Sequence, residues 1–508
     1  MKSKILLIAL LASGATLTAQ PLNRPTYAMM IQMAEEQMEK QDHYRALEWY
    51  EKAYDESKDK SLAIIIADMN YMLRDYGDAA TWYGRAFRKT KKGPDAPEEK
   101  RFEYARSLKQ AEKYDEAIEQ FNTYLVDATD PVRKELAEVE KVGCEFARVA
   151  KPQDGVNVLH GGKEVNTKNS EYSPWLSNDN KEMYFAGAGT DDLLVIEKDS
   201  SDEQGMKIFK STRGEKGWSE PTALVEGTNR IGWHNVGVKL SPDGKRMFFC
   251  RQILEGNVLK RSIIFMSENK GGSWSPAEEV KGVNTDSVAK SPAVGELFGN
   301  EVLFFASNKP GGKGGYDLYY ATYKGNGQYG DPVALSERLN TVGDEDHPFY
   351  RDGVLYFSST GHPGIGGYDI FMTTWNGTMW SKPQNLGKPY NSPADDEYFM
   401  LDQEGYHGFL TSNRLSEGAK SLKSKTSTND IYNVVLKKIT AELAALTYDL
   451  ETKEPLIGAT VQLIEVNDGV PKVLTSKTNS GGNNFDFPLE LDKSYMIIAT
   501  ADNYTPDT

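Results

Sequence analysis

One phrase recurs five times between Asp154 and Leu436, and it constrains the fold more than any other feature. Each copy holds a Ser-Pro step or its equivalent, then a turn rich in Asn, Asp or Gly, then a short run of aromatic and β-branched residues. Short strands bounded by such turns are typical of all-β domains. The copies are Ser173-Pro174 to Phe185, Ser241-Pro242 to Phe249, Ser291-Pro292 to Phe305, His347-Pro348 to Phe357, and Asp396-Glu397-Tyr398 to Leu410.

The spacing of the copies indicates how many strands each contains. The prolines of the first four copies are 68, 50 and 56 residues apart, which suits one four-stranded propeller blade per copy. An Asp marks a third strand in three copies, and a Trp or Gly turn leads into a fourth. These marks are Gly315-Tyr316-Asp317, Gly367-Tyr368-Asp369 and Asn429-Asp430 for the third strands, and Trp218, Trp274 and Trp380 for the turns.

The last copy lacks an evident fourth strand after Tyr432. A candidate strand, Val156-Asn157-Val158-Leu159, precedes the first copy instead. It is followed by Asn166-Thr167, a step that resembles Asn284-Thr285, Asn340-Thr341 and Asn391-Ser392 after the other fourth strands. We therefore predict a five-bladed β-propeller over residues 154–436, whose N-terminal strand completes the last blade. A six-bladed ring is the alternative.

Residues 27–148 are expected to be helical, because apolar residues recur there at steps of three and four. Within this part a second phrase occurs three times, with a small residue twelve positions before its Ala and an aromatic residue four positions after it. We assign these residues to the core within each repeat. A concave surface for a partner segment is the functional alternative. The residues are Ala34, Ala46 and Tyr50; Ala67, Ala79 and Tyr83; Ala105, Ala117 and Phe121.

After Leu436 the pattern changes again. Pro455 to Leu463 alternates like a half-buried strand, and Phe485–Leu489 and Tyr495–Ala499 follow with hairpin spacing. We predict a β-sandwich over residues 441–508. A further edge strand is expected beyond Tyr504, so the sandwich is expected to be incomplete and the chain to be part of a longer protein.

The N-terminus has the pattern of a signal peptide. Lys2 and Lys4 precede a short apolar run from Ile5 to Ala12, and small residues lead to Ala19. We expect cleavage near Ala19 (signal peptide 1–19), a periplasmic product and no transmembrane segment, because the run is too short to span a bilayer. The net charge of −15 argues against nucleic acid as a partner.

No residue pattern predicts a catalytic centre, a metal site or a cofactor. The two cysteines, Cys144 and Cys250, lie in separate predicted domains, so no disulfide is expected. No Gly-x-Ser-x-Gly motif occurs. None of the histidines has the spacing of a metal-ligand pair. We therefore predict no enzyme and no catalytic, cofactor-binding or metal-binding residues. The histidines are His43, His160, His234, His347, His362 and His407.

Two glycine loops, Gly311–Gly315 and Gly364–Gly367, could present backbone N–H groups to a phosphate. They lack the strand-to-helix setting that nucleotide loops require. We assign them to hairpins in which the Asp that follows each loop accepts hydrogen bonds from nearby N–H groups.

Two acidic groups, Asp344-Glu345-Asp346-His347 and Asp395-Asp396-Glu397, are candidates for one mouth of the propeller. They could bind a cation such as calcium, and paired carboxylates also suggest glycosidase chemistry. Because they recur at the same place in successive blades, we favour carboxylates that cap nearby strands.

Together these parts resemble known families. The helical phrase resembles the tetratricopeptide repeat, although its Trp and Pro are missing, and the blade phrase resembles WD40-like (PD40) propellers. The last part resembles the transthyretin-type, carboxypeptidase-regulatory-like sandwich. In this order they are similar to the OmpA-family outer-membrane-associated proteins of Bacteroidota, in particular the PorE-like group of the type IX secretion system.

That resemblance implies a non-enzymatic periplasmic scaffold associated with the outer membrane. Its partners would be proteins of a secretion complex, and a domain beyond Thr508 would bind peptidoglycan. The lipobox Cys found in many family members is missing here. The alternative function is a periplasmic glycan- or peptide-binding module whose pocket is the mouth of the propeller.

Overall fold

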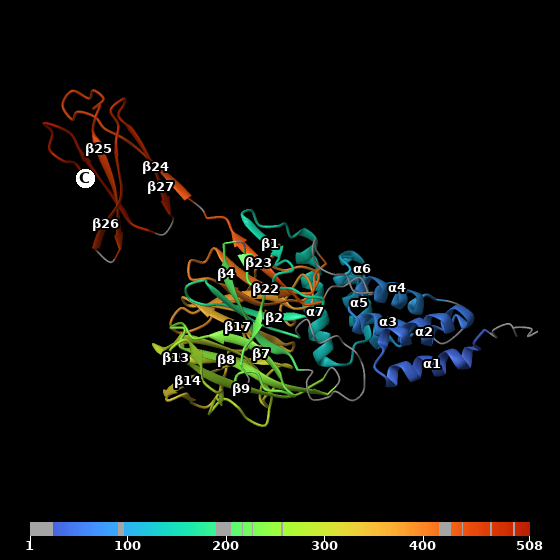
Figure 1. Cartoon of the computed structure of the whole chain (residues 1–508). Helices are drawn as coiled ribbons and strands as arrows, with labels where there is room; N and C mark the ends of the chain where they lie inside the picture. The colour runs from blue at the N-terminus through green and yellow to red at the C-terminus, as the bar shows by residue number, and fades with distance from the viewer. Residues whose placement is uncertain are drawn as a thin grey trace, which may run out of the picture. The chain divides into compact units, whose positions relative to one another are not determined.

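The computed structural model of the chain describes residues 24–89, 96–188, 205–215, 217–225, 227–255, 258–415, 428–438, 440–467, 470–490 and 493–508. The signal peptide expected at residues 1–19 lies outside these residues. The chain divides into two compact units, the second of which holds residues 154–157, 404–407 and 434–508. The described residues are largely β, with a smaller helical part before the sheets, as the sequence predicts (Figure 1).

Helices that are consecutive in the chain pack against each other in the helical part, as α1 does with α2 and α3 with α4. Four helices begin after an aspartate whose carboxylate accepts a hydrogen bond from a first-turn N–H group. The bounds are α1 Tyr27–Glu39, α2 His43–Ser57, α3 Lys60–Met72, α4 Tyr76–Phe87, the 3-10 helix η1 Glu98–Lys100, α5 Arg101–Gln110, α6 Tyr114–Asp127 and α7 Pro131–Val149.

The small and aromatic residues of the helical phrase form the core of this part. Ala34, Ala67 and Ala105 have no exposed surface, and neither have Tyr83 and Phe121. The interpretation of these positions as core is therefore confirmed. The assignment to the tetratricopeptide repeat stays a prediction.

Five sheets follow, each built mainly from strands that are consecutive in the chain. We call them blades 1 to 5. Blade 1 holds β2 Glu171–Leu176, β3 Glu182–Gly187, β4 Lys207–Gly214, β5 Gly217–Trp218 and β6 Thr222–Ala223; blade 2 holds β7 His234–Leu240, β8 Arg246–Glu255, β9 Val258–Lys270, β10 Ser273–Trp274 and β11 Glu278–Glu279; blade 3 holds β12 Ala289–Leu297, β13 Asn300–Ser307, β14 Asp317–Gly325, β15 Gln328–Tyr329 and β16 Val333–Ala334; blade 4 holds β17 Glu345–Arg351, β18 Val354–Ser359, β19 Asp369–Thr374 and β20 Gln384–Asn385; blade 5 holds β21 Asp396–Leu401, β22 His407–Ser412, β23 Asp430–Leu436 and β1 Val156–His160.

The first strands of the five blades form a closed ring. Each contacts the first strand of the next blade, and β21 of blade 5 contacts β2 of blade 1. The N-terminal strand β1 pairs with β23 and completes blade 5. The described strands thus form a five-bladed propeller, closed in the way that the sequence predicts.

One asparagine in each blade holds its third strand from the side. In every case its Oδ1 accepts a hydrogen bond from a strand N–H group and its Nδ2 donates to the carbonyl of the same residue. This contact explains the Asn that recurs in the sequence. The pairs are Asn229 with Ile208, Asn284 with Ile264, Asn340 with Leu318, Asn391 with Ile370, and Asn166 with Ile431.

The helical part contacts the propeller at two loops. A Cβ atom on Gly143 of α7 would lie 2.4 Å from the carbonyl oxygen of Gly364, so the two backbones touch. Arg74, in the α3–α4 loop, donates a 3.0 Å hydrogen bond from Nη1 to Oδ1 of Asn429. Ile365 is buried in the same apolar cluster as Cys144.

The second unit contains two small sheets, one of β24 and β27 and one of β26, β25 and β28. Side chains of both sheets, such as Phe487 and Val461, share one apolar core. The carboxypeptidase-regulatory-like assignment stays a prediction. The strands are β24 Thr440–Leu446, β25 Thr460–Asn467, β26 Val470–Thr478, β27 Asn484–Glu490 and β28 Tyr495–Thr500.

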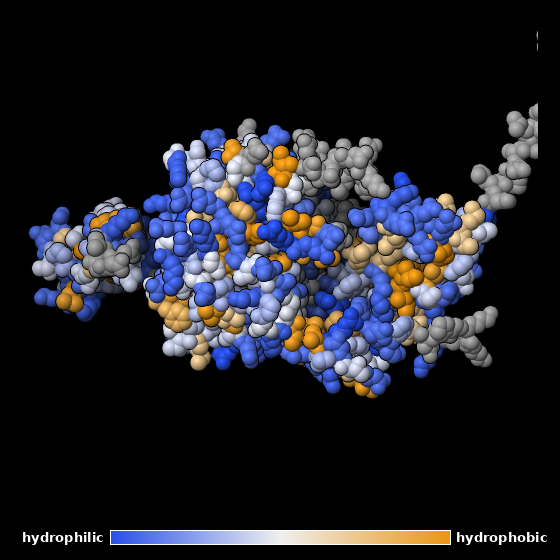
Figure 2. Space-filling view, turned by 90° about the horizontal axis from the view of Figure 1, so that it is seen from below, coloured by the Kyte–Doolittle hydropathy of each residue, from blue (hydrophilic) through white to orange (hydrophobic). Residues whose placement is uncertain are grey.

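The visible surface is mostly hydrophilic, and apolar residues gather in separate patches (Figure 2). No helix within the described ranges is long and apolar enough to cross a membrane.

Candidate functional site

The first strand of every blade carries the same irregularity. The pairing with the second strand shifts at a β-bulge, and one bulge residue has a positive φ angle. A bulge bends its strand and changes the direction of the side chains that follow. Each bulge therefore divides its strand into two halves. The start of the strand lies on one face of the ring, and its end lies on the opposite face. The positive-φ residues are Ser173, Gly237, Ser291, His347 and Tyr398.

Two of the predicted acidic residues cap turns at the start of these strands. Glu345 accepts hydrogen bonds from the N–H and the hydroxyl of Thr341, both at 2.7 Å. Asp396 accepts the equivalent bonds from Ser392 at 2.6 and 2.8 Å. The favoured interpretation, that these carboxylates support the backbone, is confirmed for this pair. Burial raises the pKa of Glu345 to about 7.

The glycine loops are held by carboxylates of their own and of the following blade. Asp317 accepts hydrogen bonds from the N–H groups of Lys313 and Gly314 at 2.8 and 3.2 Å, and Asp369 does the same for Ile365 and Gly366. Asp344 and Asp395 accept from the N–H groups of Tyr316 and Tyr368. The loops are thus hairpin structure, as predicted, and their N–H groups are used within the protein.

Asp346 and Glu397, the next residues along the two strands, point the other way, and they lie close enough for the charge of Asp346 to act on Glu397. Burial favours a raised pKa for Asp346, but the nearby His347 and Lys290, whose Nζ lies 2.6 Å from Oδ2, hold the pKa of that carboxyl down, to about 2. Burial lowers the pKa of His347 to about 3, although Asp346, 3.3 Å away, acts in the opposite direction. Burial and the nearby Asp395 raise the pKa of Glu397 to about 8. We call Lys290, Asp346, His347 and Glu397 the axial cluster.

Lys239 is a further buried amine near the axial cluster, and its charge interacts with Asp346 and His347. Its side chain reaches from blade 2 to blade 4, where Nζ donates a 2.6 Å hydrogen bond to the carbonyl of Pro348. It is 3% exposed and packs over the ring of Trp175, 5.2 Å from the ring centre. Burial lowers its pKa to about 7.

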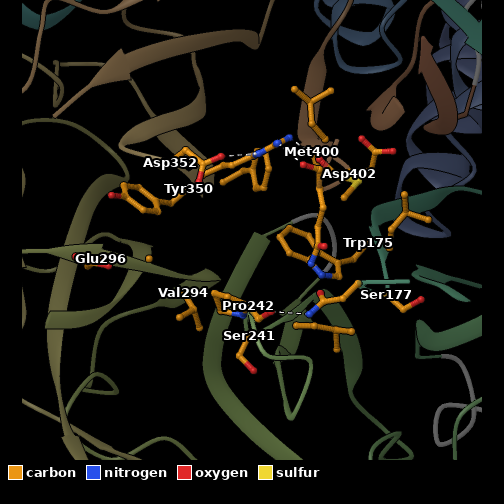
Figure 3. Close-up of a pocket in the computed structure, with 18 of the residues that line it drawn as sticks. Trp175, Ser177, Ser241, Pro242, Val294, Glu296, Tyr350, Asp352, Met400 and Asp402 are labelled. Carbon is orange, nitrogen blue, oxygen red and sulfur yellow. Dashed lines mark hydrogen bonds and ion pairs between the residues drawn. The ribbon is translucent and has the colours of Figure 1, made fainter. Parts of the chain in front are cut away.

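The open mouth is a pocket of about 840 Å³ at the C-terminal ends of the five first strands. All five blades contribute to its wall. Figure 3 shows the lining residues around a common space, with Tyr350 and Asp352 on one side and Trp175 and Ser177 on the other. Phe349 packs edge-to-face against Trp175, 5.6 Å away between ring centres. The pocket thus combines aromatic surfaces with polar groups.

The charged residues of the pocket are held in place by the rim. Arg246 binds Glu301 through two hydrogen bonds of 2.8 and 2.6 Å. Arg351 pairs with Asp352 at 3.0 Å and donates to the backbone carbonyls of Asp402 and Gln403. Asn180 donates to the carboxylate of Asp402 at 3.3 Å. These contacts fix the shape of the wall before any ligand binds.

The pocket carries more negative than positive charge. Four carboxylates line it, and Arg351 is the only Lys or Arg among the described lining residues. That guanidinium is already engaged by Asp352 and two carbonyls. Of these carboxylates, Glu296 and Asp352 are exposed and therefore disfavour an anionic ligand. The four are Glu296, Glu301, Asp352 and Asp402.

The predicted acidic residues do not form a metal site in this structure. Within the described part of the chain, no group of three or more His, Cys, Asp or Glu is arranged to hold a metal ion. Of the histidines, His160 contacts Asp430 at 3.1 Å and His362 contacts the carbonyl of Leu339 at 2.8 Å. These contacts are explained by the propeller itself.

The sequence did not single out the pocket residues. Trp175 and Phe349 each follow a Pro of the repeated phrase, Asn178 was interpreted only as a turn residue, and Ser241 was interpreted only as the Ser of the Ser-Pro step in the second copy. The signal that could have found them is their equivalent position in successive blades, just after the bulge. A ring geometry is needed to see that such positions face one another.

Comparison with known proteins gives only structural matches. No family model and no curated protein matches the chain. Among solved structures it resembles an α-L-arabinofuranosidase from Lactobacillus brevis, with 13% identity, 56% of this chain and 94% of that chain covered, and a TM-score of 0.34. It also resembles an endo-arabinase from Bacteroides thetaiotaomicron, with 15% identity, 54% of this chain and 98% of that chain covered, and a TM-score of 0.32. A third similar structure is a Penicillium chrysogenum α-L-arabinanase complexed with arabinobiose, with 10% identity, 55% of this chain and 96% of that chain covered, and a TM-score of 0.34.

These findings correct the resemblance inferred from domain order. The three structures named above are glycoside hydrolases and not OmpA-family proteins of Bacteroidota, so the predicted membership in that family and the predicted role in type IX secretion were wrong. The prediction that the chain is no enzyme is contradicted by the same matches. The physical reason is that the repeated residues serve the blades themselves, and one fold carries many functions. At these identities and TM-scores the likeness assigns no role to any residue.

Proposed function

We propose that this chain binds a neutral glycan in the pocket at the open mouth of the propeller. The observation that carries the proposal is the composition of the wall, where aromatic side chains and carboxylates from different blades face one space (Figure 3). A sugar ring has apolar C–H faces and a polar rim of hydroxyls. Aromatic surfaces suit the first, and carboxylate and amide oxygens suit the second.

Size and charge narrow the ligand class. A volume of about 840 Å³ lies within the range of pockets that enclose small ligands. The four lining carboxylates outnumber the two guanidinium groups paired with them, those of Arg351 and Arg246, and this excess disfavours uronic acids and sulfated sugars, which carry the same sign of charge. A peptide is the other ligand that the sequence suggested. The neutral glycan is favoured because hydroxyl groups can donate to several fixed carboxylates at once.

Hydrolysis of the bound glycan is the second candidate. Glycoside hydrolysis requires two carboxyl groups on either side of the scissile bond. Glu296, Asp352 and Asp402 belong to blades 3, 4 and 5, so the pocket presents carboxylates from three directions. We also propose a periplasmic location, since residues 1–19 have the pattern of a signal peptide.

The test is a binding screen of the purified chain against an array of neutral, uronic and sulfated oligosaccharides, followed by calorimetry on the hits. Glu296→Gln and Asp352→Asn change exposed pocket carboxylates and are expected to weaken binding about tenfold each, the loss of a hydrogen bond to a charged group. Glu279→Gln, on an outer strand of blade 2, is the matched control and is expected to bind like the wild type. Binding of acidic sugars alone, or of no sugar, overturns the proposal.

The hydrolysis candidate is checked with the same ligands. Release of reducing ends over hours, lost in Asp402→Asn while binding persists, supports it. Stable binding without any release leaves glycan binding as the function and removes hydrolysis.

A further inference from the structure

A second pocket of about 720 Å³ lies between blades 3 and 4. Its wall is largely aromatic and apolar, and several of its side chains are open to solvent. Phe298 is 62% exposed, Met379 53% and Val333 49%. Tyr320, Trp375 and Trp380 complete the wall.

The two pockets share one hairpin. Gly295, Glu296 and Gly299 line the first pocket, whereas Leu297 and Phe298 line the second. These residues lie at the turn between β12 and β13, so a single turn forms the border. The linings of the two pockets therefore meet at this turn.

The turn holds Phe298 in a costly conformation. Its φ angle is +55°, a region that bulky residues rarely adopt. Asn300 donates a 3.0 Å hydrogen bond to its carbonyl, and its ring meets Trp375 edge-to-face at 5.2 Å. Backbone strain of this kind concentrates at functional sites. The strained turn keeps an aromatic ring at the border between the pockets.

Charge in the second pocket is low. Among the lining residues that the structure describes, only Glu337 and Arg338 are charged, and Arg338 donates to the carbonyl of Trp380 at 3.1 Å. The surface therefore suits a neutral ligand with flat apolar faces.

We propose that the second pocket binds further sugar residues of a glycan chain whose end lies in the first pocket. The inference rests on the proposed function and extends it from a small sugar to an oligosaccharide. Continuity across the Phe298 turn, low charge and aromatic walls are the observations that support it. An apolar peptide and a second copy of this chain are the competing occupants.

The test compares a disaccharide with a hexasaccharide of the same neutral glycan by calorimetry. Wild-type protein is expected to bind the hexasaccharide at least tenfold more tightly. Phe298→Ala and Met379→Ala are expected to remove most of this gain and to leave disaccharide affinity within twofold. Phe298→Gly, which relieves the strain of the turn, is the second variant, and Val258→Ala, an exposed residue of blade 2, is the matched control.

The outcomes separate the two proposals. If neither sugar binds wild-type protein, both are overturned. If the disaccharide binds but chain length adds nothing, or Phe298→Ala weakens both sugars equally, only the second pocket's role is overturned. Light scattering tests self-association: a wild-type dimer that dissociates in Phe298→Ala overturns the proposed sugar binding in the second pocket in favour of a second copy of the chain. If an apolar peptide competes with the hexasaccharide at equal affinity, the proposal is overturned in favour of a peptide.

Discussion

The side chain of Asn166 holds the backbone of Ile431 across the seam of the propeller. Its Oδ1 accepts a 2.7 Å hydrogen bond from the N–H group of Ile431, and its Nδ2 donates a 2.9 Å bond to the carbonyl. The same contact in blade 2 joins Asn284 to Ile264, only 20 residues away in the chain. The same asparagine contact that is local in blade 2 therefore joins the two ends of the propeller chain in blade 5.

Asn166→Ala is expected to lower the free energy of unfolding. It leaves a buried N–H and a buried carbonyl without partners, at about 1–3 kcal/mol for each group. Urea unfolding measures the total, and hydrogen exchange of the Ile431 amide measures the local effect. Asn284→Ala should release the Ile264 amide instead. Unchanged protection of Ile431 in Asn166→Ala would contradict the role of this contact at the seam.

Gly143→Ala is expected to destabilise the protein although alanine favours helices. The added Cβ would meet the backbone oxygen and nitrogen of Gly364 at 2.4 and 2.9 Å, and backbone atoms cannot move aside as a flexible side chain can. Gly77→Ala in α4 is the matched control, since nothing lies within 4 Å of its added Cβ. It should stabilise by up to about 1 kcal/mol. Thermal unfolding of both variants checks the prediction, and a gain in both would show that α7 does not touch this loop.

Glu397→Gln is expected to stabilise the protein increasingly as pH rises. Burial first, and then Asp395 and Asp346, raise the pKa of this carboxyl to about 8, while Arg74 and Lys290 oppose the rise. Folding therefore favours the protonated form. The stability that this group contributes is complete below about pH 4.5, its ordinary pKa, and is lost as pH rises to 8.

Urea unfolding at pH 5 and pH 8.5 tests this sign. The variant should resemble the wild type at pH 5 and exceed it at pH 8.5, whereas Glu278→Gln, on an exposed strand of blade 2, should not change with pH. A constant difference between Glu397→Gln and wild type would show that Glu397 is ionised in the folded protein.

Both cysteines are expected to resist thiol reagents until the protein unfolds. Cys144 and Cys250 are free and have no exposed surface. Burial raises the pKa of each to about 12, so little thiolate forms at neutral pH. Labelling of Cys144→Ala and Cys250→Ala in increasing urea reports the opening of the propeller and of the helical part separately. Rapid labelling of either variant in native buffer would contradict the burial.

Local features could be predicted from the sequence because each is formed by a few neighbouring residues. The recurring Asn steps, the Asp after each glycine loop and the Ala and aromatic positions of the helices all act within one blade or one helix pair. Their roles follow from turn and strand chemistry. The exception is Asn229, whose contact with Ile208 matches the others but whose step is Thr228-Asn229 rather than Asn followed by Thr or Ser.

The acidic groups mark the limit of that reasoning. Glu345 caps a turn while its neighbour Asp346 faces the axis, because successive side chains of a strand point to opposite sides. Both residues belong to one acidic run, so the run alone could not separate them. The prediction of family membership was wrong for a related reason, since residues that build blades recur in propellers of different function.

The amino-acid sequence alone was enough to predict the order of helices and sheets, the five blades and the seam at the N-terminal strand. Repeated short-range contacts specify each of these features. The pocket was decided only by closure of the ring. Trp175, Glu296, Tyr350 and Asp402 lie far apart along the chain, and only a circle of blades brings their strand ends around one space. The turn at Phe298 lines the second pocket for the same reason, because Trp375 and Met379 opposite it come from the adjoining blade.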